Sequence, residues 1–133
     1  MGLPLPKELT LDCSKWVCGE LSYSHHNKLG DDTAMLNSYG QMCCLGQFSE
    51  QAGLLSDELL NSEFPEECDR TVTSFVRGGV ITKLAKDAIE INDNGCTTVK
   101  EKILALKELF AKNGRKIKVK NYKKATGKNW SNK

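Results

Sequence analysis

The stretch TVKEKILALKELFAKNGRKIKVK, residues 98–120, carries the plainest structural pattern in the chain. Thr98 and Glu101 form a T-x-x-E pair, in which each side chain accepts a hydrogen bond from the other residue's backbone N–H at the start of a helix. Apolar residues then follow at helical spacing along one face, namely Val99, Ile103, Leu106, Leu109 and Phe110. The pattern predicts a helix that ends before Gly114.

The segment after Gly114 alternates in the manner of a strand. Ile117 and Val119 would face the protein, and the lysines between them would share the other face, namely Lys116, Lys118 and Lys120. Lysines on a strand discourage pairing with a second chain, so we predict an edge strand. Residues 122–133 show no periodicity and predict a flexible basic tail, which leaves residues 1–121 as one globular domain.

Three further helices are predicted upstream. Residues 42–52 carry apolar side chains at helical spacing before Gly53, which suits a helix end. A short helix can start near Ser56, a favourable N-cap residue, and stop before Pro65. The apolar stripe of the third helix contains Ile81, Leu84, Ala85, Ala88 and Ile89.

The other segments predict less regular structure. Residues 7–21 are expected to form a turn or short helix, residues 37–40 the turn of a hairpin, and residues 69–76 a strand, with a helix as the alternative there. The expected fold is therefore a small, mainly helical α+β domain with a short hairpin and a C-terminal edge strand. Its core is expected to contain Trp16, Met42, Cys44, Leu45, Phe48, Ile103, Leu106 and Phe110.

Length and composition favour one folded domain. The chain has 133 residues, of which 39% are hydrophobic and 27% charged, and these fractions are typical of folded proteins. Its apolar runs are shorter than the ~18 residues of a membrane span, and the first residues lack the apolar segment of an export signal. We therefore expect a cytoplasmic protein that does not enter a membrane.

Six cysteines raise the questions of disulfides, metal binding and nucleophilic chemistry. Without an export signal, reduced and mostly buried thiols are expected. Zinc is the alternative, with a possible ligand set of Cys13, Cys18, His25 and His26, although no C-x-x-C pair occurs. Cys43 and Cys44 lie far from any basic residue in sequence, which favours packing over a reactive thiolate, and Gly46 would let another backbone approach them.

Charge is segregated along the chain. Residues 31–69 contain nine acids and no Lys or Arg, whereas residues 112–133 contain nine basic residues and no acid. The acids form a candidate partner-binding surface, for which we select Glu50, Asp57, Glu58, Glu63, Glu66 and Glu67. The basic end is a candidate nucleic-acid surface, with Lys116, Lys118, Lys120, Tyr122, Lys123, Lys124 and Trp130. The simpler interpretation is a solvated surface with a tail that improves solubility.

The sequence lacks the common catalytic motifs. The spacings of phosphate-binding loops, dinucleotide-binding turns, zinc proteases, serine esterases and calcium loops do not occur. His25 and His26 could act as acid or base beside nearby aspartates, but two loop histidines in water are the simpler interpretation. We therefore expect no catalytic residues and no cofactor.

Three segments resemble a group of small accessory proteins found among tailed phages and prophages. They are LNSYGQMCCLGQFSEQAG at 36–53, AIEINDNGCTT at 88–98 and KEKILALKELFAKNGRKIKV at 100–119. In that group a leucine-asparagine turn and a glycine precede MCCLG, an Ala-Ile-x-x-Asn-Asp segment comes next, and a helix and a strand finish the domain. The resemblance spans about residues 12–121 and does not extend to the lysine tail.

The resemblance implies expression in the cytoplasm of an infected bacterium and non-catalytic binding to a host component. That component would be a host protein such as an enzyme, the transcription machinery or an antiviral defence system, which the phage protein modulates or inhibits. The alternative is a nucleic-acid-binding module that uses the basic strand and tail. A further alternative is sequestration of a small nucleotide signal in a pocket near Cys43 and Cys44.

Overall fold

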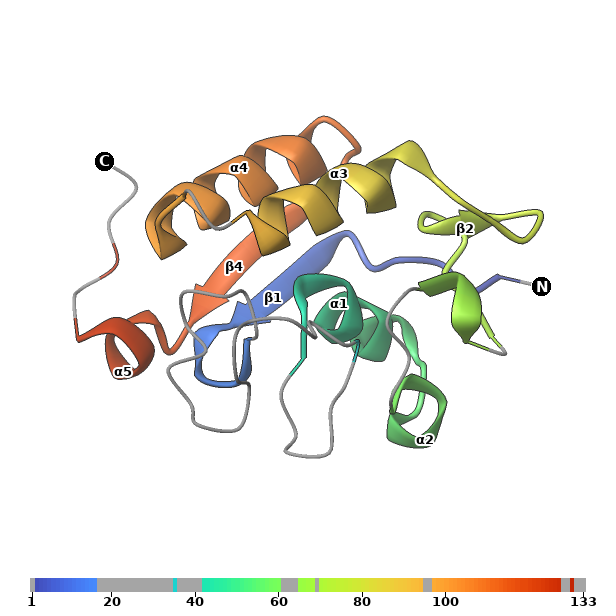
Figure 1. Cartoon of the computed structure of the whole chain (residues 1–133), viewed down its shortest axis with the longest axis horizontal. Helices are drawn as coiled ribbons and strands as arrows, with labels where there is room; N and C mark the ends of the chain where they lie inside the picture. Colours follow the sequence, from blue (N-terminus) through green and yellow to red (C-terminus); the bar gives the residue numbers. More distant parts are fainter. Residues whose placement is uncertain are drawn as a thin grey trace.

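The protein has an α+β fold in which most of the regular structure is helical (Figure 1). The computed structural model describes residues 2–16, 35, 42–60, 65–68, 70–94, 97–127 and 130. The main elements are β1 (Glu8–Asp12), α1 (Cys44–Ala52), α2 (Ser56–Leu59), β2 (Val76–Arg77), β3 (Val80–Ile81), α3 (Lys83–Asp93), α4 (Val99–Ala111), β4 (Lys116–Lys120) and α5 (Tyr122–Thr126), with short 3-10 helices at Cys13–Lys15 (η1) and Pro65–Glu67 (η3).

The central sheet joins the two ends of the chain. β1 and β4 pair in parallel, with Leu9 opposite Ile117 and Leu11 opposite Val119. A turn or short helix was predicted where β1 lies, and that prediction is wrong. The apolar alternation of Leu9 and Leu11 is complete only with a partner strand that lies more than a hundred residues later in sequence.

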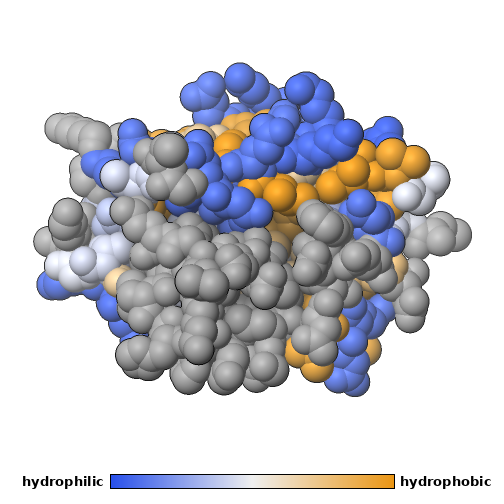
Figure 2. Space-filling view, viewed as in Figure 1, coloured by the Kyte–Doolittle hydropathy of each residue, from blue (hydrophilic) through white to orange (hydrophobic). Residues whose placement is uncertain are grey.

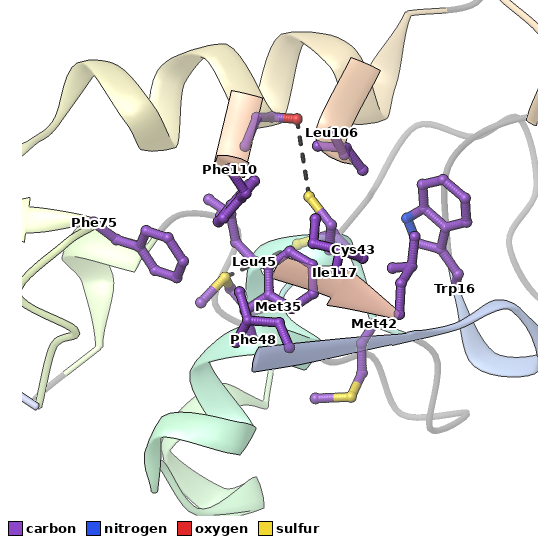
Figure 3. Packing of buried hydrophobic residues seen from close by; sticks show 14 of the residues in the cluster. Trp16, Met35, Met42, Cys43, Leu45, Phe48, Phe75, Leu106, Phe110 and Ile117 are labelled. Atoms are coloured by element: carbon purple, nitrogen blue, oxygen red, sulfur yellow. Dashed lines mark hydrogen bonds between the residues drawn. The ribbon is translucent and has the colours of Figure 1, made fainter. Parts of the chain in front are cut away.

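Helices cover the sheet and fill the core. α4 packs against β4, α1 packs against β1, and α3 contacts both of these helices (Figure 1). Phe110 of α4 lies at the centre, with its ring centroid 5.1 Å from that of Phe48 and 6.4 Å from that of Phe75 (Figure 3). The eight side chains expected in the core are buried, namely Trp16, Met42, Cys44, Leu45, Phe48, Ile103, Leu106 and Phe110.

Two glutamines of α1 occupy the edge of β1 that faces away from β4. The side chain of Gln47 accepts from the backbone N–H of Asp12 at 2.7 Å and donates to its carbonyl at 3.0 Å. Gln51, one turn later, makes the same pair of bonds with Thr10, both at 2.7 Å. These amide groups take the place of a third strand at Thr10 and Asp12, whose backbone N–H and carbonyl groups are thereby satisfied.

The predicted α4 and β4 are present, and several boundaries differ elsewhere. Thr98 and Glu101 make the expected reciprocal cap of α4. α1 begins at Cys44 rather than at 42, because Cys43 is its N-cap. The hairpin turn predicted at 37–40 lies outside the described residues. A hairpin is found instead between β2 and β3, where Gly78 and Gly79 have φ values of 58° and 79°, as a tight two-residue turn requires.

The basic end is more ordered than predicted. A flexible tail was predicted from residue 122, but residues 122–126 form α5. Tyr122 is buried, and its ring packs edge-to-face on Trp130 with centroids 5.1 Å apart. Asn121, which precedes α5, donates to the carboxylate of Asp12 at 2.8 Å. The apolar face of Tyr122 and this hydrogen bond attach the segment to the domain.

Candidate functional site

Asn92 connects three parts of the chain that lie far apart in sequence. This side chain is 1% exposed, and its Oδ1 accepts from the indole N–H of Trp16 and, at 3.1 Å, from the backbone N–H of Cys44. Its amide nitrogen donates to Asp93 at 2.9 Å. Asn92 therefore ties the end of α3 to the start of α1, and its role is to hold the fold together.

The adjacent cysteines belong to the same buried junction. The sulfur of Cys43 caps α1 by accepting from the backbone N–H of Gly46 at 3.4 Å, and the thiol of Cys44 lies 3.9 Å from the carbonyl oxygen of Ala88. Burial raises the pKa of the Cys43 thiol to about 12, although the Gly46 N–H acts in the opposite direction. A thiol with so high a pKa stays protonated at neutral pH and is a poor nucleophile.

The start of α1 is closely packed against neighbouring parts of the chain. Each residue of α1 from Cys44 to Ser49 is buried. A Cβ atom on Gly46 would lie 1.8 Å from the carbonyl oxygen of Met35, which confirms the close backbone approach expected there. Gln47 turns toward β1 and is 1% exposed. Within the described part of the chain, the start of α1 is therefore packed against its neighbours.

The proposed zinc ligands lie mostly outside the described residues. Cys18, His25 and His26 are among those positions, and Cys13 is buried at 3% exposure. Within the described part of the chain, no three His, Cys, Asp or Glu side chains are placed to hold a metal ion. The zinc site therefore stays a prediction, because three of its four proposed ligands are not among the described residues.

The acidic candidates divide into paired and unpaired groups. Glu50 lies 3.3 Å from the ammonium of Lys15. Glu58 accepts two hydrogen bonds from the guanidinium of Arg70, at 2.7 and 2.6 Å. These bonds, together with one from the backbone N–H of Leu55, lower the pKa of Glu58 to about 2. Glu50 and Glu58 thus have basic partners that come from outside the acidic third of the sequence.

The other acids lie apart from those pairs. Asp57 and Glu66 are exposed, and neither makes an ion pair with a described residue. Glu63 and the side chain of Glu67 lie outside the described residues. Among the six acidic candidates, Asp57 on α2 and Glu66 on η3 are thus the described ones without an ion pair to a described residue, and the surface of six acids remains a prediction.

Glu66 borders an apolar groove that the sequence did not reveal. The groove has a volume of about 300 Å³ and is lined by Glu66, Ile81, Lys86, Ile89 and Glu90. We call it the Ile81–Ile89 groove. Both isoleucines are partly buried, whereas the three charged side chains are exposed and make no ion pair with a described residue. Figure 2 shows hydrophobic residues at the upper right, over the region of β2, β3 and the start of α3.

The groove was missed because Ile81 and Ile89 fit the apolar stripe of a helix that packs inward. The structure buries Ala85 and Ala88 completely but leaves the two isoleucines at the border of the core. A sequence signal was nevertheless present, because Lys86 and Glu90 flank Ile89 on the same helix. An apolar position between charges one turn apart is typical of the boundary of a helix face.

The basic candidates divide between a strand face and a packed aromatic pair. The lysines on the outer face of β4 are exposed, namely Lys116, Lys118 and Lys120, as are Lys123 and Lys124 on α5. Lys118 pairs with Glu8 at 3.0 Å. Tyr122 and Trp130 were expected to stack on bases, but they pack on each other, and the ammonium of Lys107 lies 5.2 Å from the Trp130 ring. The lysines can meet phosphates, whereas the aromatic rings are already engaged.

Comparison with protein-family models, curated proteins and solved structures yields no match to this chain. The longest described helix, α4, has 13 residues, fewer than the ~20 that cross a bilayer, and no other described helix is long and apolar enough to do so. Among the surfaces of the described residues, the Ile81–Ile89 groove is an apolar one with a charged rim.

Proposed function

We propose that this protein is a non-catalytic binding protein that attaches to a bacterial host protein through the Ile81–Ile89 groove. The partner would place an apolar side chain between Ile81 and Ile89, with a Lys or Arg beside it. The observation that carries the proposal is the groove itself, in which two exposed carboxylates and one lysine border partly buried isoleucines. Binding there would modulate or inhibit a host enzyme, the transcription machinery or a defence system.

The chemistry of the groove supports a protein partner of that kind. Apolar surface removed from water contributes about 25 cal/mol per Å², so one apolar side chain inserted between the isoleucines would contribute about 1.5–3 kcal/mol to binding. The exposed rim favours a partner of complementary charge, because Glu66 and Glu90 outnumber Lys86. Rim charges of this type set specificity and association rate more than affinity.

The proposal of a bacterial partner rests on the resemblance of the sequence to phage accessory proteins. Proteins of that origin act in the cytoplasm of an infected bacterium, and the partner is therefore sought among bacterial proteins. The buried, protonated Cys43 and the packed start of α1 argue against chemistry at the cysteines, which leaves binding as the favoured class.

The test joins capture with a measurement of affinity. A tagged protein is used to retain partners from a bacterial lysate at low and at high salt, and the retained protein is identified by mass spectrometry. Purified partner is then titrated into the protein by isothermal calorimetry. We expect one partner, held at equal stoichiometry and retained at high salt, because the apolar contact is not screened.

Charge reversal at the rim connects the partner to the groove. Glu66→Lys combined with Glu90→Lys should weaken binding at least tenfold, since both side chains are exposed and would then repel a basic partner. Asp57→Lys is the matched control, because Asp57 is an exposed acid that does not line the groove. Equal weakening by the control, unchanged binding of the double variant, or the capture of no partner at all would each contradict the proposal.

A nucleic-acid-binding role is the second candidate, favoured by the exposed lysines on the outer face of β4. Substitution of Lys116, Lys118 and Lys120 by glutamine should abolish binding to a single-stranded oligonucleotide. In the unsubstituted protein, the logarithm of the affinity should fall with the logarithm of salt concentration, with a slope of about 0.7 per phosphate contacted. Binding that is insensitive to salt, or unchanged in the triple variant, would exclude this surface.

A further inference from the structure

A second cavity lies beside the β2–β3 hairpin and shares no lining residue with the Ile81–Ile89 groove. It has a volume of about 470 Å³ and is lined by Ser74, Arg77, Thr82, Leu84, Asn113 and Arg115. These residues come from the segment around β2, from the start of α3 and from the turn between α4 and β4. Because the last of these lies some thirty residues after the others in sequence, only the fold brings the two arginines to one cavity.

The guanidinium groups of Arg77 and Arg115 are not neutralised by an acid among the described residues. Among the described residues, no carboxylate forms an ion pair with Arg77 or Arg115, and the five ion pairs found there use other bases. One terminal nitrogen of Arg115 makes only long bonds, of 3.4 and 3.5 Å, to the carbonyl oxygens of Asn113 and Gly114. Its Nε–H is buried and has no acceptor in the described structure. The donors within reach of a ligand are therefore the guanidinium of Arg77, which is exposed, and the terminal nitrogens of Arg115.

The start of α3 adds to the positive character of the cavity. Thr82 is the N-cap of this 11-residue helix, and its hydroxyl accepts from the N–H of Ala85 at 3.2 Å while donating to the carbonyl of Ser74 at 2.7 Å. The first N–H groups of a helix have no partner within it, and they carry the positive end of the helix dipole. Thr82 therefore fixes the helix start beside the two guanidinium groups.

We infer that this cavity binds the phosphate group of a small ligand. Guanidinium groups present paired N–H donors that match two phosphate oxygens, and hydroxyl and amide side chains can serve the remaining oxygens. The volume falls within the range of small-molecule sites, roughly 300–1,000 Å³. The site is separate from the Ile81–Ile89 groove, so each can be tested without the other.

Titration calorimetry at low salt tests the inference with two probes, inorganic pyrophosphate and adenosine monophosphate. Tighter binding of pyrophosphate would identify an inorganic ligand, and tighter binding of adenosine monophosphate would identify an organic phosphate ester. Either result supports the site if Arg77→Gln weakens binding about tenfold or more, as expected for the loss of hydrogen bonds to a charged group. Arg77→Lys should weaken it less, because the charge is kept and the fork is lost.

Lys7→Gln serves as the matched control, since it removes one exposed positive charge outside the cavity and should change the affinity less than twofold. Arg77 is exposed, so its substitution is not expected to unfold the protein, which a thermal melt would verify. Amide NMR shifts should change at residues 82–85 and 113–115 when the probe binds. Absence of binding by both probes at millimolar concentration, or equal weakening by Lys7→Gln, would overturn the inference.

Discussion

Replacing each glutamine of α1 by methionine tests whether burial or the number of hydrogen bonds determines its contribution. Gln47 and Gln51 belong to one helix, and each makes two short hydrogen bonds to the backbone of β1. They differ in exposure, because Gln47 is 1% exposed whereas Gln51 lies at the surface. Methionine has similar length and helix propensity but cannot bond to the strand.

The structure gives different expected costs for the two substitutions. Gln47→Met leaves the N–H and the carbonyl of Asp12 without partners in a partly buried position, at ~1–3 kcal/mol per unsatisfied group, so the free energy of unfolding should fall by about 2–6 kcal/mol. Gln51→Met exposes the same groups of Thr10 to water, which replaces the lost bonds, and the cost should stay below ~1 kcal/mol.

Urea denaturation, monitored by circular dichroism, measures the change in unfolding free energy for each variant. The comparison requires that the dependence of the unfolding free energy on urea concentration is the same in the unsubstituted protein and in both variants. A cost for Gln51→Met equal to or greater than that for Gln47→Met would refute the reasoning. It would show that the strand edge depends on the amide bonds themselves rather than on their removal from water.

Three further predictions concern the same region and the ion pairs. Gly46→Ala should lower the free energy of unfolding by at least ~1–3 kcal/mol, because the new methyl group meets the Met35 carbonyl oxygen, and a cost near zero in a urea titration would contradict that contact. In the native protein at pH 8, Cys43 should resist alkylation by iodoacetamide, measured by mass spectrometry, until urea unfolds the chain; modification of the folded protein would contradict a buried thiol with a pKa of about 12. Arg70→Gln should raise the pKa of Glu58 from about 2 toward its ordinary value of 4.5, as followed by NMR titration, and an unchanged pKa would show that Arg70 is not its cause.

Burial of Cys43 also has a consequence for stability at high pH. Its pKa is about 12 in the folded protein and near the ordinary value of 9.0 when unfolded, so the unfolded chain loses this proton first. Stability should therefore decline between pH 9 and 12, by at most ~1.4 kcal/mol per pH unit from this group. Cys43→Ser, which keeps an acceptor at the N-cap, should decline less steeply over the same range in urea titrations, and an identical decline would contradict the assignment to Cys43.

Local signals in the sequence predicted the elements that are determined locally. The Thr98–Glu101 cap and the apolar stripe specify α4 without help from the rest of the chain, and the lysine alternation specifies β4. β1 was missed because a short run such as Glu8–Asp12 becomes a strand only when β4 and the glutamines of α1 bond to it. Helix signals act over four residues, whereas parallel pairing acts over any separation.

Side chains that hydrogen-bond to another helix or strand were equally difficult to predict from the sequence. Lys102 lies in a charged run of α4, yet it is 1% exposed, and its ammonium donates to the carbonyls of Ile91 and Asn94 at the end of α3. Asn92 would be taken for a turn residue, although its side chain joins Trp16 to the start of α1. Polar residues in such positions satisfy backbone groups of another element, and no pattern within their own segment indicates this.

The two arginines of the second cavity show that a candidate site, too, can be invisible in the sequence. Arg77 follows an apolar run and Arg115 follows a helix-ending glycine, so each has an ordinary local explanation. Only the antiparallel packing of α3 and α4 brings the turn after α4 to the start of α3 (Figure 1). A site assembled in this way has no sequence motif, and the absence of a phosphate-binding motif is therefore weak evidence against phosphate binding.

Buried and exposed side chains of the same region call for different substitutions. Cys43, Cys44 and Asn92 are each buried at the junction of α1 and α3. Substitution of these residues would disturb the packing of the fold and so would not report on a binding surface. Glu90 is exposed and lies on the rim of the Ile81–Ile89 groove. Binding specificity is set by exposed side chains placed on a fold, so charge reversal at the groove rim is the more decisive substitution.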